Sequence, residues 1–392
     1  MSKIRKIIAF SKGDSRQCST WSNVPYYFLK NIEKKGIKVV RVNLQWEDDS
    51  AFAKKVIKFG NALIRHSYRL LQKGSTAMNT IDRLAIYEKV ENRRIKEAIN
   101  QNPDADIALF FDYSHSLKTN NSIKVALFCD WTIAYEIKNH QNRVPNHFEK
   151  KAIHRQYQHM EQSDCIITLF PNVYAELVKH FGREKVYYLG NVINAEMNTK
   201  LDQSIMLAAH YNSNRVLMIG RKAYKEGLIQ LAESVKIYNE GKPESHQLLI
   251  DVIGMTEKET GLNDDHIIYY GYLNKNNTEQ KNTYYNLIQG AKVICNTTEN
   301  WVGISSIIEA MYWKLPVIIN PTEDIYKTFG QQISFGRYVE KNDSAEIGNA
   351  LKWILELDRD SYSEVCEASY KAVKDFTWEG YVERIVETFE TL

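Results

Sequence analysis

The sequence predicts an α/β protein made of two consecutive doubly wound, Rossmann-like domains that face a cleft. Its 392 residues exceed the roughly 250–300 residues at which a single hydrophobic core stops growing. Short β-branched runs alternate with amphipathic stretches in both halves of the chain, as in parallel sheets covered by helices. The alternation stops at residues 196–214, which show no clean period and which we interpret as a linker, and restarts at Arg215.

The first domain is predicted to span residues 1–196. A strand at 4–10, a helix at 24–35 and a strand at 38–42 form its βαβ beginning. Residues 49–100 are expected to form a helical insert of two amphipathic stretches, 49–72 and 78–100, separated by Gly74-Ser75-Thr76. Further strands are expected at 107–111, 123–129, 165–169 and 186–189, and helices at about 145–162 and 171–181.

The second domain is predicted to span residues 197–376, and a terminal helix follows at 377–392. Strands are expected at 215–219, 247–253, 267–270, 292–295 and 316–319, and helices at 225–240, 278–289, 303–313, 344–357 and 361–375. Ligands of such sheets bind beyond the carboxyl ends of the strands, so the loops that leave these strands are the places to search for function.

Composition is that of an ordinary globular protein, with 44% hydrophobic and 25% charged residues. The segment MSKIRKIIAF has only four consecutive apolar residues, too few for a signal peptide, and no run of about 18 apolar residues occurs. The five cysteines are scattered without a C-x-x-C pair, which is typical of a reducing compartment. We therefore expect a cytoplasmic protein.

Charge divides unequally between the halves, although the net charge is only +3. Residues 1–200 contain 32 Lys and Arg against 20 Asp and Glu, whereas residues 201–392 contain 19 against 28. A basic half attracts anionic surfaces, although this bias can also reflect general composition. Residues 50–73 combine six Lys and Arg with apolar residues, so this helix is compatible either with an anionic membrane surface or with a core-facing position.

A first chemical motif follows the strand at 215–219. Gly220-Arg221-Lys222-Ala223-Tyr224-Lys225-Glu226-Gly227 leads from this strand into a helix. Glycine permits close approach of the backbone to a ligand, and a helix N-terminus beside cations favours an anion such as phosphate. By itself the motif is weak, because basic loops between strands and helices are common.

A second motif runs from the end of the strand at 292–295 into the next helix. Glu299 lies on the loop, Gly303 opens the helix with Ile304, and Glu309 lies about two turns into it. The two carboxylates could converge on one polyhydroxylated ligand, with the free N–H groups after Gly303 aimed at its phosphates. A solvated carboxylate is the alternative for Glu309, and its apolar setting in IIEAM argues against that.

These motifs resemble those of the retaining glycosyltransferases of the GT-B fold, the large group 1 family. The resemblance covers residues 215–320 and is carried by ordered elements: Gly220-Arg221, Lys225 with Gly227, Tyr270-Gly271-Tyr272-Leu273, Asn296-Thr297-Thr298-Glu299, Gly303-Ile304, Glu309-Ala310-Met311 and Leu315-Pro316-Val317-Ile318. It implies a nucleotide-sugar donor bound by the second domain and a terminal helix that crosses back to the first domain. It also implies a glycan or lipid-linked acceptor.

The resemblance also implies roles for individual residues. Arg221 and Lys225 would neutralise the donor diphosphate, Glu299 would hold sugar hydroxyls and Glu309 the ribose, while Tyr272 and Leu273 would lie beside the base. Fixed cations stabilise the charge that develops on a nucleoside diphosphate leaving group, so neither a metal nor a further cofactor is required.

The chain departs from the family pattern in three places. Nine residues instead of seven separate Glu299 from Glu309, and Glu226 interrupts the usual Lys-Gly pair, which leaves either Lys222 or Lys225 to reach the phosphates. The first loop has Lys12-Gly13-Asp14-Ser15-Arg16 where the family has a Gly-Gly pair.

The first domain supplies candidates for the acceptor side. Gly13 and Arg16 lie in the loop after the first strand. Gly13 would permit backbone approach to the donor and Arg16 would contact a phosphate or the acceptor, or both belong to a surface turn. Asp130, at the end of its strand, is expected to accept hydrogen bonds from donor or acceptor hydroxyls, to help remove the acceptor proton, or to cap the helix that begins at Thr132. His115 is a further candidate, and Asn191 is expected to have a structural role.

These observations predict a retaining glycosyltransferase of cell-surface polysaccharide synthesis. The alternatives are a nucleotide-sugar epimerase of the same fold and a non-catalytic glycan-binding partner subunit. No basic motif interleaved with aromatic residues occurs, so no nucleic-acid partner is expected.

Overall fold

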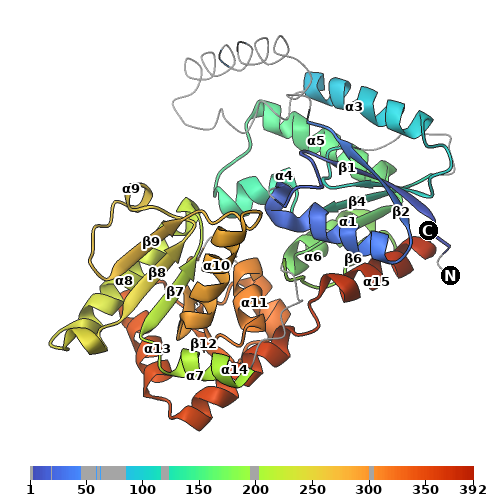
Figure 1. Ribbon diagram of the computed structural model, residues 1–392. Helices are drawn as coiled ribbons and strands as arrows, with labels where there is room; N and C mark the ends of the chain where they lie inside the picture. The colour runs from blue at the N-terminus through green and yellow to red at the C-terminus, as the bar shows by residue number, and fades with distance from the viewer. Residues whose placement is uncertain are drawn as a thin grey trace. The chain divides into compact units, whose positions relative to one another are not determined.

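The computed structural model describes residues 3–18, 20–45, 85–115, 123–194, 203–299 and 304–392, together with residues 59 and 62. The chain forms two compact units, Met1–Leu189 with Tyr381–Leu392, and Gly190–Gly380. Each unit contains one six-stranded sheet of parallel strands with helices packed around it (Figure 1). The fold class predicted from the sequence is therefore confirmed, while the cleft stays a prediction.

The sheet of the first unit has the strand order β2-β1-β3-β4-β5-β6. Its strands are β1 (Lys6–Ser11), β2 (Lys38–Asn43), β3 (Ile107–Phe110), β4 (Lys124–Cys129), β5 (Cys165–Thr168) and β6 (Val186–Tyr188). The central strands are buried along their length, as expected for a sheet with helices on both faces.

The helical elements of this unit are η1 (Thr20–Asn23), α1 (Val24–Lys34), α3 (Ala85–Asn100), α4 (Ile133–Tyr135), η5 (Glu136–His140), α5 (His147–Gln162), α6 (Pro171–Phe181) and most of α15 (Trp378–Glu390). Phe128 contacts Phe28 of α1 and Tyr381 of α15, with ring centroids 5.2 Å and 6.3 Å away. These two helices therefore pack on the same face of the sheet.

The predicted helical insert is described only in part. The stretch 49–72, apart from residues 59 and 62, lies outside the described residues, and the stretch 78–100 is described from the start of α3. On α3, the buried residues Ile95, Ala98 and Ile99 lie toward the C-terminal end, and Glu91 is buried toward the N-terminal end. The helix thus combines apolar packing with a buried carboxylate.

The sheet of the second unit has the strand order β12-β11-β10-β7-β8-β9. Its strands are β7 (Arg215–Ile219), β8 (Leu249–Ile253), β9 (Ile267–Gly271), β10 (Val293–Asn296), β11 (Val317–Ile319) and β12 (Gly336–Tyr338). Its helical elements are α7 (Gln203–Tyr211), η6 (Lys222–Tyr224), α8 (Lys225–Asn239), η7 (Glu244–His246), α9 (Glu257–Thr260), α10 (Thr278–Gly290), α11 (Ile304–Tyr312), α12 (Glu323–Phe329), α13 (Ser344–Glu356) and α14 (Arg359–Val373).

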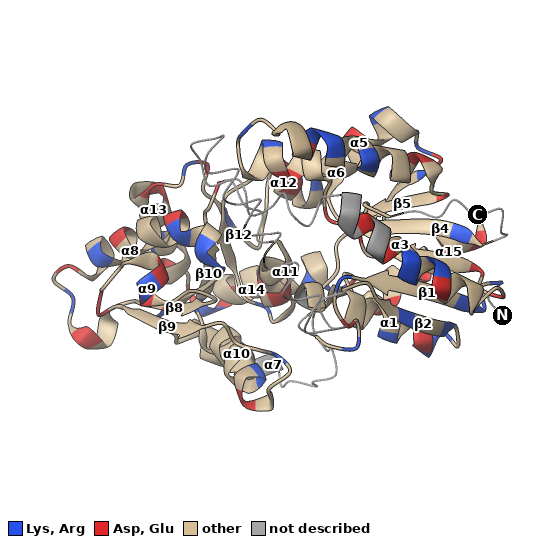
Figure 2. Cartoon of the chain, turned by 90° about the horizontal axis from the view of Figure 1, so that it is seen from above, with Lys and Arg blue, Asp and Glu red and all other residues tan. Residues whose placement is uncertain are grey.

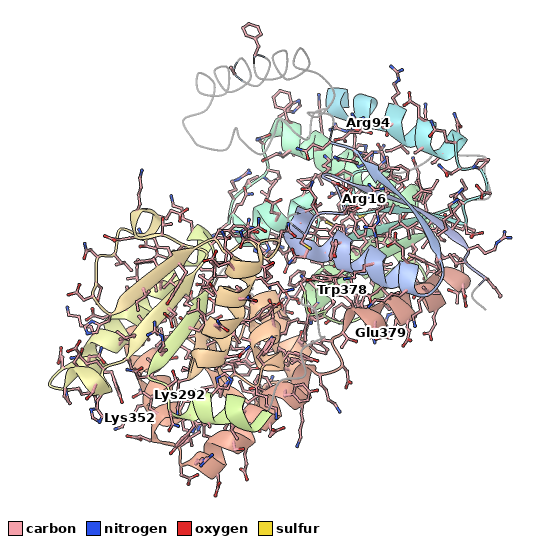
Figure 3. The ribbon with its side chains drawn as sticks, in the orientation of Figure 1. Arg16, Arg94, Lys292, Lys352, Trp378 and Glu379 are labelled. Carbon is pink, nitrogen blue, oxygen red and sulfur yellow. The ribbon has the colours of Figure 1, made fainter. Side chains whose placement is uncertain are left out.

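The interpretation of residues 196–214 as a linker is wrong for residues 203–211, which form α7. The imidazole nitrogens of His210 lie 2.7 Å and 3.1 Å from the carbonyl oxygens of Ala291 and Trp313. Lys292 donates to the carbonyl of Tyr211 at 2.8 Å and is drawn beside α7 in Figure 3. Tertiary contacts, rather than a clean apolar period, therefore hold this helix against the unit.

Among the described residues, none of the helices is both long enough and apolar enough to cross a membrane.

Candidate active site

Each sheet contains one point at which the strand order reverses. In the second unit, β8 and β9 follow β7 on one side, while β10, β11 and β12 extend the sheet on the other. In the first unit the reversal lies between β1 and β3. Open α/β sheets bind ligands outside the carboxyl ends of their strands at such switch points. The loops after β7 and β10, and those after β1 and β3, are therefore the positions to inspect.

The loop after β7 concentrates positive charge at the beginning of α8. Arg221 is exposed, with its guanidinium carbon 5.7 Å from the ring centre of Tyr272. Lys222 begins η6 and Lys225 begins α8. None of these three cations forms an ion pair with a residue that the structure describes. Together with the N–H groups of a 15-residue helix, they form a favourable environment for an anion.

A glycine brings the start of α8 close to the end of β10. A Cβ atom at Gly227 would lie 2.5 Å from Oγ1 of Thr298, and one at Gly220 would lie 2.7 Å from the Tyr224 ring. Any larger residue at position 227 must therefore displace the Thr298 side chain or move α8 away from β10. Gly227, which was predicted to let the backbone approach a ligand, thus sets the distance between α8 and β10.

The loop after β10 carries polar groups at the same edge of the sheet. Nδ2 of Asn296 is buried and has no hydrogen-bond partner among the described residues. Oγ1 of Thr297 donates to Oδ1 of Asn342 at 2.7 Å, and the Asn342 N–H donates to Oε1 of the exposed Glu299 at 3.1 Å. A buried amide donor without a partner is rare and suits a ligand oxygen.

Glu309 lies on α11 with only 3% of its surface exposed. Its carboxylate accepts from Nζ of Lys275 at 2.6 Å and 2.7 Å, and from the hydroxyls of Tyr284 and Tyr285 at 3.0 Å each. Burial, and then the Glu309 charge, raise the pKa of Tyr284 well above its ordinary value, so this phenol stays a donor. The solvated alternative for Glu309 is therefore wrong.

The predicted donor residues lie in different surroundings. Tyr272 is 62% exposed, Leu273 is half-buried, and Ile304 is buried at the first position of α11. Gly303 lies outside the described residues. Within the described part of the chain, Glu299 and Glu309 share no hydrogen-bond partner, so the two carboxylates do not meet on one group there.

Sequence reasoning missed the residues that hold the two glutamates. Lys275 follows the Tyr270-Gly271-Tyr272-Leu273 segment by two positions, and Asn342 lies beyond β12, which was not predicted. A lysine that must neutralise a buried glutamate has no sequence signal, because its partner lies 34 residues away. Asn191, expected to be structural, donates to Oγ1 of Thr328 at 3.4 Å.

In the first unit, the loop after β1 is held by its own hydrogen bonds. Gly13 has a positive φ of 105°, and its N–H donates to Oδ1 of Asn43 at 3.0 Å. The exposed side chain of Arg16 lies 3.6 Å from Asp14, and its backbone N–H donates to the same carboxylate at 3.0 Å. Oγ of Ser15 is buried and has no partner among the described residues. Gly13 therefore shapes the turn, and Arg16 is on its exposed side.

Asp130 lies directly after β4, where its Oδ2 accepts from the indole N–H of Trp21 at 3.2 Å. Burial raises the pKa of Asp130 from an ordinary 3.8 to about 7, and the Trp21 hydrogen bond only partly opposes this shift. The N-cap alternative is wrong, because Thr132 caps α4 by accepting from the Tyr135 N–H at 3.0 Å. The carboxyl group is thus poised to take up or release a proton near neutral pH.

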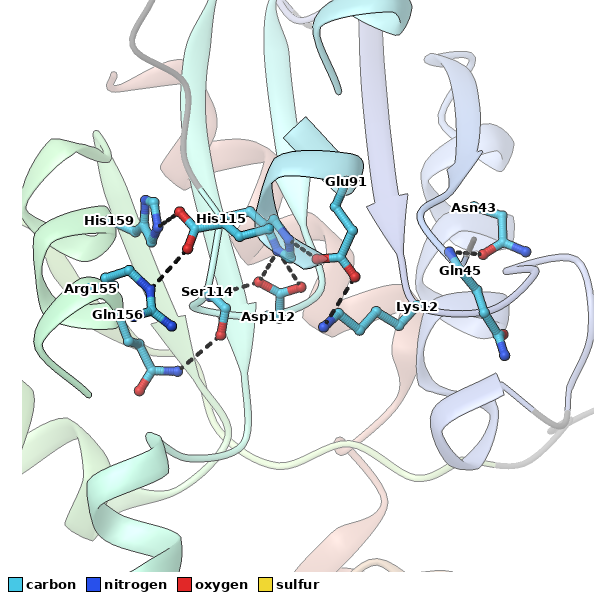
Figure 4. A network of polar contacts seen from close by, with 11 residues as sticks. Lys12, Asn43, Gln45, Glu91, Asp112, Ser114, His115, Arg155, Gln156 and His159 are labelled. Atoms are coloured by element: carbon cyan, nitrogen blue, oxygen red, sulfur yellow. Dashed lines mark hydrogen bonds and ion pairs between the residues drawn. The ribbon is translucent and has the colours of Figure 1, made fainter. Parts of the chain in front are cut away.

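His115 lies after β3 at the centre of a charged network (Figure 4). Its Nδ1 is 2.9 Å from both Asp112 oxygens, and its Nε2 is 2.5 Å from Glu91 of α3. Burial opposes a charged imidazole, but Asp112 and Glu91 prevail and raise the pKa of His115 to about 9. Lys12 is 3.4 Å from Glu91. Two cations and two anions therefore meet at the switch point of this sheet.

No group of three or more His, Cys, Asp or Glu side chains in the described ranges is arranged to hold a metal ion. The expectation that no metal is required stays a prediction.

The sequence matches no protein-family model and no curated protein sequence. Solved structures, in contrast, are similar over nearly the whole chain. Sucrose-phosphate synthase from Thermosynechococcus elongatus superposes with a TM-score of 0.68 at 12% identity, covering 99% of this chain and 98% of that one. WaaG, a glycosyltransferase involved in lipopolysaccharide biosynthesis, gives 0.60 at 13% identity, with 97% and 98% covered.

TarM from S. aureus, solved with fondaparinux, α-GlcNAc-glycerol and UDP, gives a TM-score of 0.53 at 14% identity over 76% of this chain. The present chain spans only 59% of the TarM chain. The architecture of this protein is thus the GT-B fold found in glycosyltransferases. The fold predicted from the motif resemblance is confirmed.

Proposed function

We propose that this protein is a retaining glycosyltransferase that moves a sugar from a nucleotide-sugar to a hydroxyl group of a glycan or glycolipid, in cell-surface polysaccharide synthesis. The GT-B architecture, the motifs of the second unit and the involvement of WaaG in lipopolysaccharide biosynthesis support this proposal. The donor binds to the second unit, and the acceptor binds to the first.

One observation carries the proposal: Arg221, Lys222 and Lys225 surround the start of α8 at the switch point without an ion pair to a described residue. Unpaired cations beside a helix N-terminus suit the diphosphate of a nucleotide-sugar. They also stabilise the negative charge that develops on the departing nucleoside diphosphate. In this proposal no bound metal is needed for that stabilisation. Asn296 adds a buried donor at the same edge.

The remaining donor contacts in the proposal are those that the motif resemblance implies. Glu309 accepts a ribose hydroxyl in the proposal, with Lys275 and the two tyrosines fixing its orientation. Glu299 and the segment that begins at Gly303 contact the transferred sugar and its phosphates, and Tyr272 with Leu273 lies beside the base. On the acceptor side, Asp130 takes the proton of the attacking hydroxyl, and Gly13 and Arg16 border the donor phosphates.

The donor half is tested by binding. A ligand that binds only the folded state raises the unfolding temperature, so UDP, GDP, ADP and CMP are compared first, and then their sugars. Replacement of Arg221 or Lys225 by alanine is expected to weaken binding of the preferred nucleotide about tenfold to a hundredfold, the usual effect of losing a charged hydrogen bond. Lys236→Ala, in the exposed last turn of α8, is the matched control.

The transfer reaction is tested by turnover. Arg221→Ala and Glu309→Ala are expected to reduce consumption of the nucleotide-sugar in the presence of acceptor. Unchanged turnover in both variants would refute the site. A new nucleotide-sugar formed without any acceptor would indicate an epimerase instead, and absence of both turnover and donor hydrolysis would favour a non-catalytic glycan-binding subunit.

We also propose that the protein acts in the cytoplasm, where it associates with an anionic membrane surface that carries a lipid-linked acceptor. The support is the positive charge of residues 1–200 and the basic pattern at 50–73, of which only residues 59 and 62 are described. On α3, basic and acidic residues lie side by side (Figure 2), so this helix adds no uniform positive face.

A further inference from the structure

A cavity of about 310 Å³ lies in the first unit beyond the ends of β3 and β4. Residues of α3, α4, η5 and α5 line it, together with Trp131, two positions after the end of β4. The volume is at the lower end of the roughly 300–1,000 Å³ of small-molecule sites, which suits one or two small rings. Figure 4 shows the polar side chains at its border that take part in hydrogen bonds and ion pairs.

The cations that line this cavity are already neutralised by carboxylates. Arg155 is 3.0 Å from Glu88. Lys12 and His115 are paired with Glu91 within the network described above. A phosphate or carboxylate entering the cavity would find no excess of positive charge, and it would lose its water without compensation. The charge pattern therefore disfavours an anionic ligand.

The polar groups nevertheless suit a ligand with many hydroxyls. Carboxylates accept from hydroxyl groups, and Nε2 of Gln156 can donate to one, whereas its Oε1 already accepts from the Ile133 N–H at 2.9 Å. Nε2 of Gln156 donates to Oγ of Ser114 at 3.4 Å, which is long for a hydrogen bond. A ligand hydroxyl could replace Ser114 as the acceptor. Glu136 of η5 also lines the cavity, where it accepts from Gln141 at 3.0 Å.

Trp131 supplies a flat apolar surface at the same cavity. Its ring is half-buried and lies 4.5 Å from the ring of His140 and 5.4 Å from that of Phe170, so its orientation is fixed by two neighbours. The negative face of an indole attracts the weakly positive C–H groups of a saturated ring. A pyranose offers such a C–H face together with a rim of hydroxyls, and this combination matches Trp131 among carboxylates and amides.

We propose that this cavity binds an uncharged pyranose ring, with Trp131 stacked on its C–H face and Glu136 and Gln156 bonded to its hydroxyls. That the bound ring belongs to the acceptor rests on the proposed function. The binding of a neutral pyranose in this cavity does not depend on it. The chemistry selects a neutral glycan over a sugar phosphate.

The experiment measures binding of methyl α-D-glucopyranoside, methyl α-D-galactopyranoside and methyl α-D-mannopyranoside to the full chain by saturation-transfer NMR and titration. The 6-phosphate of each is the charged counterpart. At least one neutral glycoside is expected to bind, and at least fivefold more tightly than its phosphate. Trp131→Ala is expected to weaken that binding about fivefold to tenfold, the worth of an aromatic contact, whereas Trp131→Phe retains most of it.

Matched measurements keep the outcome interpretable. Phe148→Ala removes a 43% exposed aromatic residue of α5 outside the cavity lining and should leave glycoside binding unchanged. Glu136→Gln serves as a second cavity variant if Trp131→Ala does not fold. Absence of binding by all three glycosides, tighter binding of the phosphates, or full binding by Trp131→Ala would overturn the inference. The rise in unfolding temperature caused by nucleotides, measured on the same samples, tests the donor site independently. If nucleotides fail to stabilise the protein while a glycoside still binds, the proposed function is contradicted and the glycan site is not.

Discussion

Two ionisable residues of the first unit have pKa values that are raised for different reasons. His115 is held as an imidazolium between carboxylates, and its pKa is raised to about 9. Among the described residues, the Asp130 carboxyl accepts a side-chain hydrogen bond from the Trp21 indole alone, and burial raises its pKa to about 7. Partners therefore decide the protonation state of His115, whereas burial decides that of Asp130.

Replacing Asp130 by asparagine should stabilise the protein increasingly as the pH rises. Because the folded state holds the Asp130 proton more tightly than the unfolded chain, the cost of ionisation is absent below about pH 4 and grows up to about pH 7. Asparagine keeps an acceptor for the Trp21 N–H and does not ionise. Urea unfolding of both proteins at pH 5 and pH 7.5 measures the difference. An equal difference in unfolding free energy at both pH values would contradict the assigned pKa.

The same substitution tests the proposed catalytic role. If Asp130 accepts the proton of the acceptor, the kcat/KM of the wild type rises through about pH 7, and the variant lacks that rise.

Replacing His115 by glutamine should destabilise the fold by roughly 3–5 kcal/mol at pH 7, because the buried carboxylate of Glu91 and the half-buried carboxylate of Asp112 lose their shared cation. Because the pKa of His115 is raised, the charged imidazole makes its full contribution to the free energy of unfolding below about pH 6.5. That contribution is lost as the pH rises through about 9. Urea unfolding at pH 6, 8 and 10 should therefore show a loss that narrows at the highest pH. His154→Gln, an exposed position on α5, provides the comparison. A constant loss at all three values would mean that His115 acts through packing alone.

At the scale of elements, the junction of α8 with β10 determines how closely the helix N-terminus approaches the switch point. Gly227 faces Thr298 with no space for a side chain, whereas Gly348, inside α13, has no neighbouring atom within 4 Å of a Cβ. A side chain is therefore excluded by a close neighbour at position 227, whereas no such neighbour excludes one at position 348.

Gly227→Ala and Gly348→Ala are expected to have opposite effects. Alanine at position 348 should stabilise the protein by about 0.5–1 kcal/mol through higher helix propensity. Alanine at position 227 should destabilise it by about 1–3 kcal/mol through overpacking and should weaken nucleotide binding, because α8 must shift. Thermal unfolding with and without UDP measures both effects.

Thr298→Ala removes the closest clashing atom, so the double variant with Gly227→Ala should recover part of the lost stability. Failure of any recovery would show that the backbone, rather than Oγ1, limits position 227.

At the scale of the whole molecule, the two halves of the sequence differ in charge while the net charge stays near neutral. Such a division favours attraction of the basic half to anionic surfaces. Salt weakens this attraction, because at 0.1 M ionic strength charges more than about 10 Å apart are largely screened from each other.

The protein is expected to float with vesicles that contain anionic lipid at low salt and to be released as salt increases. Each Lys or Arg near the surface contributes on the order of 1 kcal/mol. Replacing Lys54, Lys55 and Lys58 by glutamine should reduce the bound fraction, and the same change at Lys236, Lys352 and Lys371 of the second half is the control. Flotation that is equal with neutral vesicles, or absent at low salt, would refute the membrane proposal.

Local patterns were sufficient to predict most described strands and helices, because alternating β-branched runs and amphipathic stretches need only neighbours in the chain. The exceptions have a common cause. α7 is held by carbonyls of Ala291 and Trp313, and β12 and α12 are too short to show a period. Their positions depend on contacts with distant residues, which no window of sequence contains.

The sequence by itself determined the two-domain α/β organisation and the motifs at the ends of β7 and β10, since strand alternation and glycine or charge patterns are local. Only the tertiary structure decided the state of the individual side chains. It buried Glu309 among Lys275, Tyr284 and Tyr285, enclosed His115 between Asp112 and Glu91, and left Asp130 beside Trp21. The reason is physical: burial and the distance to an opposite charge set the protonation and reach of a side chain, and both depend on residues far apart in the chain.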